Sequence, residues 1–130
     1  MSDSPNIALA RRLYDSKGDP AVSQEIMAPD IVWDVTPGFP NGGVYNGLDS
    51  VGGDFFRRVF EVFESFYAEG EQFFEDADNH VFVLGHYHGV SKKGKTAKVR
   101  FIHLWTVRDG KLAHMQQAAD SHIAQLALED

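Results

Sequence analysis

The chain has 130 residues, 43% of them hydrophobic, which is enough for one domain around a single core and too little for two. A net charge of −7, with the only basic run at the turn 92–98, excludes a surface that follows nucleic-acid phosphates. The absence of cysteine excludes disulfides and thiolate chemistry, and with no leader-like N-terminus or long apolar run we expect a cytoplasmic protein without membrane contact.

Three helices and one strand are predicted in the first half of the chain. Ser4-Pro5 is a typical helix start, and the helix over 5–17 ends at Gly18. Asp19-Pro20 starts a shorter helix that ends before Pro29 and leads into the strand IVWDV. After the glycine- and proline-rich loop 36–43, an aromatic stripe at helical spacing predicts a third helix over 48–66.

From residue 71 onward the apolar period falls to two. The segments 71–77, 80–90, 96–107 and 111–119 are predicted strands, joined by Lys-Gly and Asp-Gly turns, and 121–130 is a short closing helix. Helices followed by an antiparallel meander predict an α+β fold, with the helices on one face of a curved sheet. We treat residues 1–130 as a single domain.

The turns predict which residues share a face of the sheet. If Lys93-Gly94 and Asp109-Gly110 are two-residue turns, three cross-strand rows share one face. This face mixes polar and apolar side chains, which is typical of a ligand cavity wall rather than of a core or a surface. The rows are Leu84–His103–Gln116, His86–Phe101–Ala118 and His88–Val99–Asp120.

Two residues on this face are candidates for catalysis. Asp120, with apolar neighbours, is suited to remove a proton from carbon next to a carbonyl, and equally suited to cap the helix that follows it. His103 is suited to donate a hydrogen bond to an oxyanion, or else to be a core histidine bonded to Gln116. His86 and His88 have a metal-ligand spacing, but Asp120 across the sheet is the one carboxylate placed near them, so a wet pocket wall or the protein surface is the favoured interpretation.

Four segments, in order, resemble the nuclear transport factor 2-like superfamily. They are APDIVWDVTPG, VYNGLDSVGGDFF, VLGHYHG and FIHLWTVRDGKLAHMQQAADSH. The likeness spans nearly the whole chain and lies in the branch of SnoaL-like polyketide cyclases and ketosteroid isomerase-like proteins. It implies a cystatin-like cone, in which a curved antiparallel sheet wraps around helices and encloses a deep apolar pocket, often in a dimer formed through the sheet.

The resemblance also implies roles for individual residues. Asp120 matches the general acid/base of the cyclases, and His103 stands where steroid isomerases hold a protonated acid. The isomerases' proton-shuttling Asp falls at Val35, and the Asp-Arg-Asp set of epoxide hydrolases is incomplete, so both activities are disfavoured. Ligand contacts of Trp33 and Tyr14 are also implied by the resemblance, and the assumed register of the strands adds His86, His88, Phe101, Trp105 and Gln116.

The sequence therefore predicts a small-molecule pocket protein that transfers protons α to a carbonyl of an apolar ring substrate, with Asp120 as base and His103 as donor. A non-catalytic ligand-binding or dimeric interaction domain on the same scaffold is the alternative. No cofactor and no metal are expected, because no phosphate-binding glycine loop or thiolate cluster is present. The expected partners are a small apolar ligand and a second copy of the chain.

Overall fold

The structure is a computed structural model that describes residues 3–130. It opens with helices α1 (Pro5–Asp15) and α2 (Pro20–Ile26), followed by strands β1 (Met27–Val35) and β2 (Gly43–Asn46). A continuous helical stretch comprises α3 (Leu48–Ser50), the π-helix η1 (Val51–Phe56) and α4 (Arg57–Val62). Four long strands, β3 (Phe63–Glu75), β4 (His80–Ser91), β5 (Thr96–Arg108) and β6 (Lys111–Ala119), lead to α5 (Ser121–Leu126).

The first two helices begin where the sequence predicts. The Ser4 hydroxyl accepts a hydrogen bond from the Ile7 amide at 3.2 Å, and the Asp19 carboxylate accepts one from Ala21 at 2.9 Å. Each helix therefore has one of its free N-terminal amides satisfied by a capping side chain.

The third predicted helix is too long. The observed helical stretch ends at Val62, whereas the prediction extends it to residue 66. Residues 63–66 belong to β3, where Phe63 pairs with Ser91 and is 2% exposed. The aromatic spacing fits a helix, but pairing with β4 satisfies the backbone of this segment, and aromatic side chains are also favoured in strands. The short strand β2 was not expected from the sequence either.

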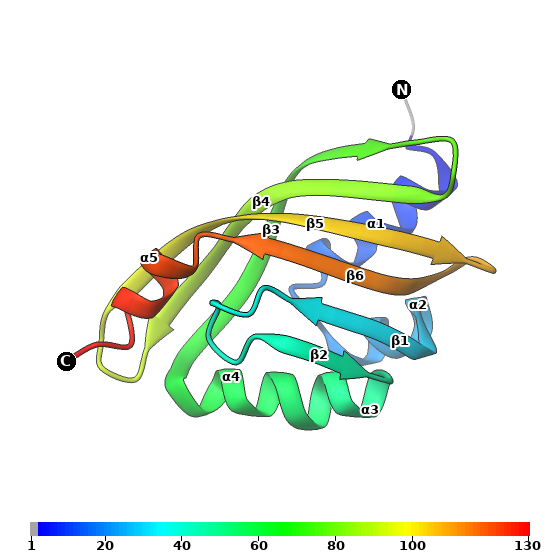
Figure 1. Cartoon of the computed structure of the whole chain (residues 1–130). Helices are drawn as coiled ribbons and strands as arrows, with labels where there is room; N and C mark the ends of the chain where they lie inside the picture. The colour runs from blue at the N-terminus through cyan, green and yellow to red at the C-terminus, as the bar shows by residue number, and fades with distance from the viewer. Residues whose placement is uncertain (1–2) are drawn as a thin grey trace.

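All six strands form one sheet in the order β2-β1-β6-β5-β4-β3. Neighbouring strands are antiparallel except β1 and β6, which run parallel. Figure 1 shows the strong curvature of the sheet, with α1 and α2 behind it and α3–α4 along its open side. We call the face toward these helices the inner face and the opposite one the outer face.

The observed register differs by one residue from the predicted one. The β4–β5 loop has three residues, Lys92 to Gly94, with Gly94 at φ +81°, so Val83 rather than Leu84 faces His103. The Asp109-Gly110 turn has two residues, as predicted, but a bulge at Ala113 then shifts β6, so His103 faces Gln117. Each shift of one residue exchanges the two faces of a strand.

Buried side chains occupy the inner face and the helices packed on it. The largest fully buried ones include Trp105, Phe101, Phe63 and Ile31. The α+β architecture predicted from the sequence is confirmed. No helix within residues 3–130 is both long and apolar enough to cross a membrane.

Candidate functional site

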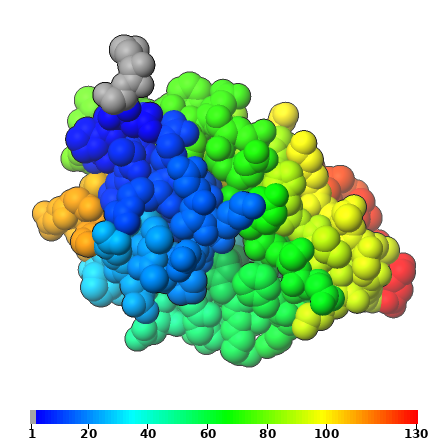
Figure 2. Space-filling model, turned by 180° about the vertical axis from the view of Figure 1, so that it is seen from behind, coloured from blue at the N-terminus to red at the C-terminus, as the bar shows by residue number. Residues whose placement is uncertain are grey.

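A cavity of about 320 Å³ lies between the inner face of the sheet and the helices. Exposed residues of the α1–α2 turn, of η1 and of α4, together with β3, form its rim, and these elements meet on the side of the molecule shown in Figure 2. Among the described residues that line it, Lys17 at the rim carries the one formal charge. Its wall is otherwise mostly aromatic and includes Tyr14, Trp33, Phe55, Phe66, Tyr87 and Trp105.

His103 is the centre of a buried hydrogen-bond network on the cavity wall. Its Nδ1 lies 2.6 Å from the Tyr14 hydroxyl, and its Nε2 lies 2.6 Å from the Tyr87 hydroxyl. The Trp105 indole N–H donates to the Tyr14 oxygen at 2.8 Å, and the Gln117 amide nitrogen donates to the Tyr87 oxygen at 2.9 Å. The Gln117 amide oxygen accepts from the Thr36 backbone at 3.1 Å, which fixes the orientation of that amide.

Burial keeps every member of this network neutral. His103 is 4% exposed, and desolvation lowers its pKa to about 3. Desolvation also raises the pKa of Tyr14 and of Tyr87 above that of a free phenol. Near neutral pH the site therefore holds two phenols and one neutral imidazole, because a charge in this apolar setting is strongly disfavoured.

A neutral network of this composition contains one hydrogen more than it can use. Trp105, Tyr14, Tyr87 and the imidazole each bring one donor hydrogen, and the Gln117 amide directs one of its two hydrogens to Tyr87, whereas four contacts join these groups. If Nδ1 carries the proton, it donates to Tyr14 and the Tyr87 hydroxyl donates to Nε2; if Nε2 carries it, the two tyrosines exchange roles. In either tautomer, the hydroxyl that accepts from the imidazole keeps its own hydrogen free of any partner in the network. Both tyrosines line the cavity, so the spare donor belongs to the cavity wall.

The network is held in place by aromatic packing and by two glycines. The Phe101 ring stacks on His103 with centroids 3.9 Å apart and planes 15° apart. A Cβ at Gly85 would lie 2.8 Å from the Phe101 ring, and one at Gly70 would lie 2.9 Å from the Tyr14 ring. Because real Cβ atoms do not approach this closely, the rings reach these positions only against glycine.

A second unused donor lies nearby. The Trp33 indole N–H is the single buried side-chain polar atom without a hydrogen-bond partner among residues 3–130. Trp33 lines the cavity and packs edge-on against Trp105 with centroids 5.7 Å apart. Leaving a buried donor unpaired costs about 1–3 kcal/mol, so Trp33 is held in this position at some cost to stability.

The predicted site residues fall into two groups. Tyr14, Trp33, His103 and Trp105 line the cavity together, and Phe101 lies directly behind His103. The prediction that His86, His88 and Gln116 share this face is wrong, because the one-residue register shifts place them on the outer face. There His86 pairs with Glu71 at 2.5 Å and His88 with Glu69 at 2.8 Å, and no three His, Asp or Glu side chains within residues 3–130 are grouped to hold a metal ion.

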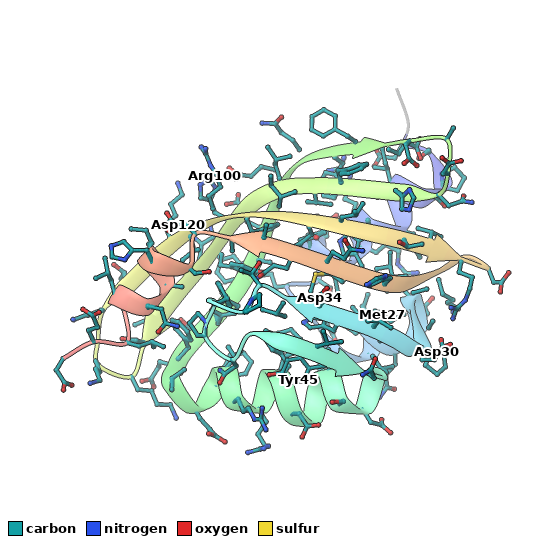
Figure 3. All side chains as sticks on the ribbon, viewed as in Figure 1. Met27, Asp30, Asp34, Tyr45, Arg100 and Asp120 are labelled. Atoms are coloured by element: carbon teal, nitrogen blue, oxygen red, sulfur yellow. The ribbon has the colours of Figure 1, made fainter. Side chains whose placement is uncertain are left out.

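Asp120 lies outside the cavity lining. Figure 3 shows it where β6 ends and α5 begins, close to Arg100. Its carboxylate accepts a hydrogen bond from the Ile123 amide at 3.2 Å, so it caps α5, and its side chain is exposed. Asp34 also belongs to the outer face, whereas Val35 is buried. Catalysis by Asp120 stays a prediction from the sequence.

Tyr87 and Gln117 complete the network and were not predicted as site residues. The assumed two-residue Lys93-Gly94 turn places Tyr87 on the opposite face, and a β6 without the unforeseen bulge at Ala113 places Gln117 there as well. The signal for Tyr87 lies in the Lys92-Lys93-Gly94 loop, because a three-residue hairpin with a left-handed glycine is a common alternative. No local signal indicates the bulge.

Comparisons with known proteins agree with this geometry. The model of the SnoaL-like domain family matches residues 10–115, most of the chain. No curated protein matches it.

Several solved structures share the fold over nearly the whole chain. TerC, co-crystallised with polyporic acid, is 29% identical with a TM-score of 0.88, covering 98% of this chain and 100% of its own. A nuclear transport factor 2-like protein from Burkholderia thailandensis is 28% identical with a TM-score of 0.87, covering 99% and 100%. A protein from Jannaschia sp. CCS1 with the provisional name of a SnoaL-like polyketide cyclase is 22% identical with a TM-score of 0.77, covering 98% and 96%. The predicted nuclear transport factor 2-like fold is confirmed.

Proposed function

The chain belongs to the SnoaL-like domain family, and on that premise we propose that its cavity binds an apolar ring compound through a carbonyl oxygen and catalyses proton transfer at the adjacent carbon. The spare tyrosine hydroxyl beside His103 carries this proposal. A neutral donor fixed in an apolar wall favours an oxygen that gains negative charge during enolisation, since little water is present to compete for it.

Two further observations support a ring ligand. The aromatic wall suits a flat apolar body. The relationship to TerC supports a small organic ligand, because that protein was co-crystallised with polyporic acid.

The proposal is tested with a matched pair of ligands. α-Tetralone has a ring carbonyl with exchangeable α-protons, and tetralin has the same rings without the oxygen. In thermal-shift titrations α-tetralone should stabilise the wild type, by about 2.7 kcal/mol at 100 times its Kd, and tetralin should do so less. NMR in D2O should then show α-proton exchange catalysed by the protein.

The double variant Y14F/Y87F removes both hydroxyls, and with them the spare donor. Because this change also leaves the Trp105 and Gln117 N–H groups without their acceptors, its readout is the exchange reaction, which it should not catalyse. Binding of the ketone by the wild type without exchange would instead identify the alternative, a non-catalytic ligand-binding protein. If a series of ring ketones and steroid enones neither binds nor exchanges, the proposal is refuted.

We also propose that the outer face of the sheet forms a homodimer. It carries a shallow groove lined by Phe82, Ile102 and Leu104, and Ile102 is 45% exposed. Apolar patches of this kind on a sheet mark association surfaces. Analytical ultracentrifugation should give a dimer for the wild type and a monomer for I102K, and a wild-type monomer would contradict the proposal.

A further inference from the structure

The described cavity wall contains no carboxylate that could take up the α-proton. Within residues 3–130, none of the residues lining the cavity is Asp or Glu. The one side chain there with a formal charge is Lys17, a cationic group that lies at the rim. A base for the proposed reaction must therefore come from the neutral network itself or from a residue outside the lining.

We propose that Tyr14, His103 and Tyr87 form a bifunctional proton relay. One tyrosine protonates the carbonyl oxygen, the other accepts the α-proton, and His103 passes the compensating proton between them. This inference rests on the proposed function and adds the identity of the base. Tyr14 and Tyr87 are the catalytic residues, and His103 is a positioning residue that acts through both.

The geometry fits such a relay. Both imidazole nitrogens are engaged by phenol oxygens at 2.6 Å, so the ring accepts a proton on one side while it releases one on the other. Trp105 and Gln117 each donate to one phenol oxygen, which stabilises negative charge that develops there during transfer. Both phenols line the same cavity, so one ligand is within reach of both ends.

The transfer conserves all protons and charges. At the start, Tyr14 donates to Nδ1, Nε2–H donates to Tyr87, and the Tyr87 hydroxyl donates to the ligand carbonyl. The Tyr87 proton then moves to the carbonyl oxygen, the Nε2 proton to Tyr87, the Tyr14 proton to Nδ1, and the α-proton to Tyr14. The C–H electron pair forms the new C=C bond, and the carbonyl π pair forms the new O–H bond. The product is a neutral enol, and the imidazole has changed tautomer.

The reverse transfer completes a reaction cycle. After the first step Tyr14 holds the spare hydroxyl proton and can return it to the original carbon or, in a conjugated ligand, to another carbon. The enol proton returns through Tyr87 and the tautomer is restored. Return to the original carbon gives exchange with solvent deuterium when the Tyr14 hydroxyl hydrogen has first been replaced by deuterium from water that enters at the cavity rim. Transfer to another carbon gives isomerisation.

The relay is also compatible with a buried site, because it forms no charged intermediate. Desolvation lowers the pKa of His103 to about 3 and raises that of both tyrosines, so a mechanism through a free imidazolium or phenolate is strongly opposed. The relay needs neither ion as an intermediate, because each group gains one proton as it loses another.

The variant H103Q separates the relay from the hydrogen bonds. A glutamine amide accepts from one tyrosine through its oxygen and donates to the other through its nitrogen, so a hydroxyl remains spare, but an amide does not pass protons readily. We expect H103Q to bind α-tetralone within about threefold of the wild-type Kd and to exchange its α-protons at least about 100-fold more slowly. Y45F removes a phenol oxygen that bonds to Asn41 outside the cavity and serves as the matched control, with wild-type exchange.

Other outcomes decide against the relay. Wild-type exchange in H103Q overturns it, as does loss of exchange in D120N without loss in H103Q, which would assign the base to Asp120 and leave the proposed function intact. If H103Q does not fold, Y14F and Y87F decide, because the relay requires both hydroxyls and is overturned if either variant exchanges at the wild-type rate. If the wild type catalyses no exchange, the relay and the proposed catalytic function fall together.

Discussion

The cavity has two walls that are built differently. The sheet wall, formed by β1, β3, β4 and β5 with Tyr14 of α1, is packed around the His103 network, and a methyl group added at Gly85 or Gly70 would collide with its neighbours. The helical wall, formed by η1 and α4, is apolar. A Cβ at Gly52 or Gly53 would meet nothing within 4 Å, and Phe60 is 44% exposed.

The two walls therefore suit different roles, orientation of a bound ligand by the sheet wall and entry of the ligand past the helical wall. Hydrogen bonds between donors of fixed direction need a wall that does not move, and a sheet with ladder bonds on both sides of each central strand provides it. The helical wall contains a π-helix, whose hydrogen-bond pattern is less favourable than that of an α-helix and recurs at functional sites. We expect ligands to enter past η1 and α4 and to be oriented by the sheet.

The largest effect is expected on the sheet wall. G85A places a methyl group against the Phe101 ring and the β3 backbone, neither of which can move without disturbing the His103 network. Overpacking of this kind should lower the free energy of unfolding by about 3 kcal/mol. Urea unfolding measures it, and a loss below 1 kcal/mol would show that the sheet wall is as adaptable as the helical one.

A pH dependence is expected from the same wall. His103 binds a proton in the unfolded chain at a pKa of about 6.5 but in the folded protein only near pH 3. Between these values the unfolded state holds more protons, so stability falls as the pH falls, by up to about 1.4 kcal/mol per pH unit. Urea unfolding between pH 7 and 4 should show that the free energy of unfolding falls more steeply for the wild type than for H103Q. The two proteins have the same carboxylates, so the difference between their slopes reports His103. Equal slopes would mean that His103 has the same pKa in the folded and unfolded chains.

The smallest effect is expected on the helical wall, with the opposite sign. G53A adds a methyl group where space is open and reduces the freedom of the unfolded chain, so it should raise stability by about 0.5 kcal/mol. The melting temperature measures the change. A destabilised G53A would show that η1 requires glycine for its backbone conformation, and the contrast between the walls would weaken.

Local signals in the sequence predicted much of the fold. The caps at Ser4 and Asp19 and the Asp109-Gly110 turn are chemical features of a few adjacent residues, and each appears where expected. The end of the third helix and the parallel β1–β6 pairing depend on distant strands, which helix-like spacing does not reveal. Like the short strand β2 and the register of β4 and β6, they were not predicted from the sequence.

The candidate site was predicted only in part, for the same reason. Four of the predicted residues line the cavity, because β5, α1 and β1 turn the expected faces inward. They are His103, Tyr14, Trp33 and Trp105. The neighbours of His103 depend on a third loop residue and on a bulge at Ala113, and neither follows from alternation of apolar residues. Single-residue irregularities of this kind decide which of two opposite side chains reaches the pocket.

The Lys92–Gly94 loop lies far along the hairpin from His103, yet its length selects the chemistry beside that residue. β4 carries two sets of side chains in alternation, with Tyr87 on one face and His86 and His88 on the other. Loss of a single loop residue would turn the histidines toward the cavity and the phenol away from it. Insertions and deletions in this hairpin are therefore a route by which a scaffold of this kind can exchange a neutral phenol site for an imidazole-rich one without changing any residue of the strand.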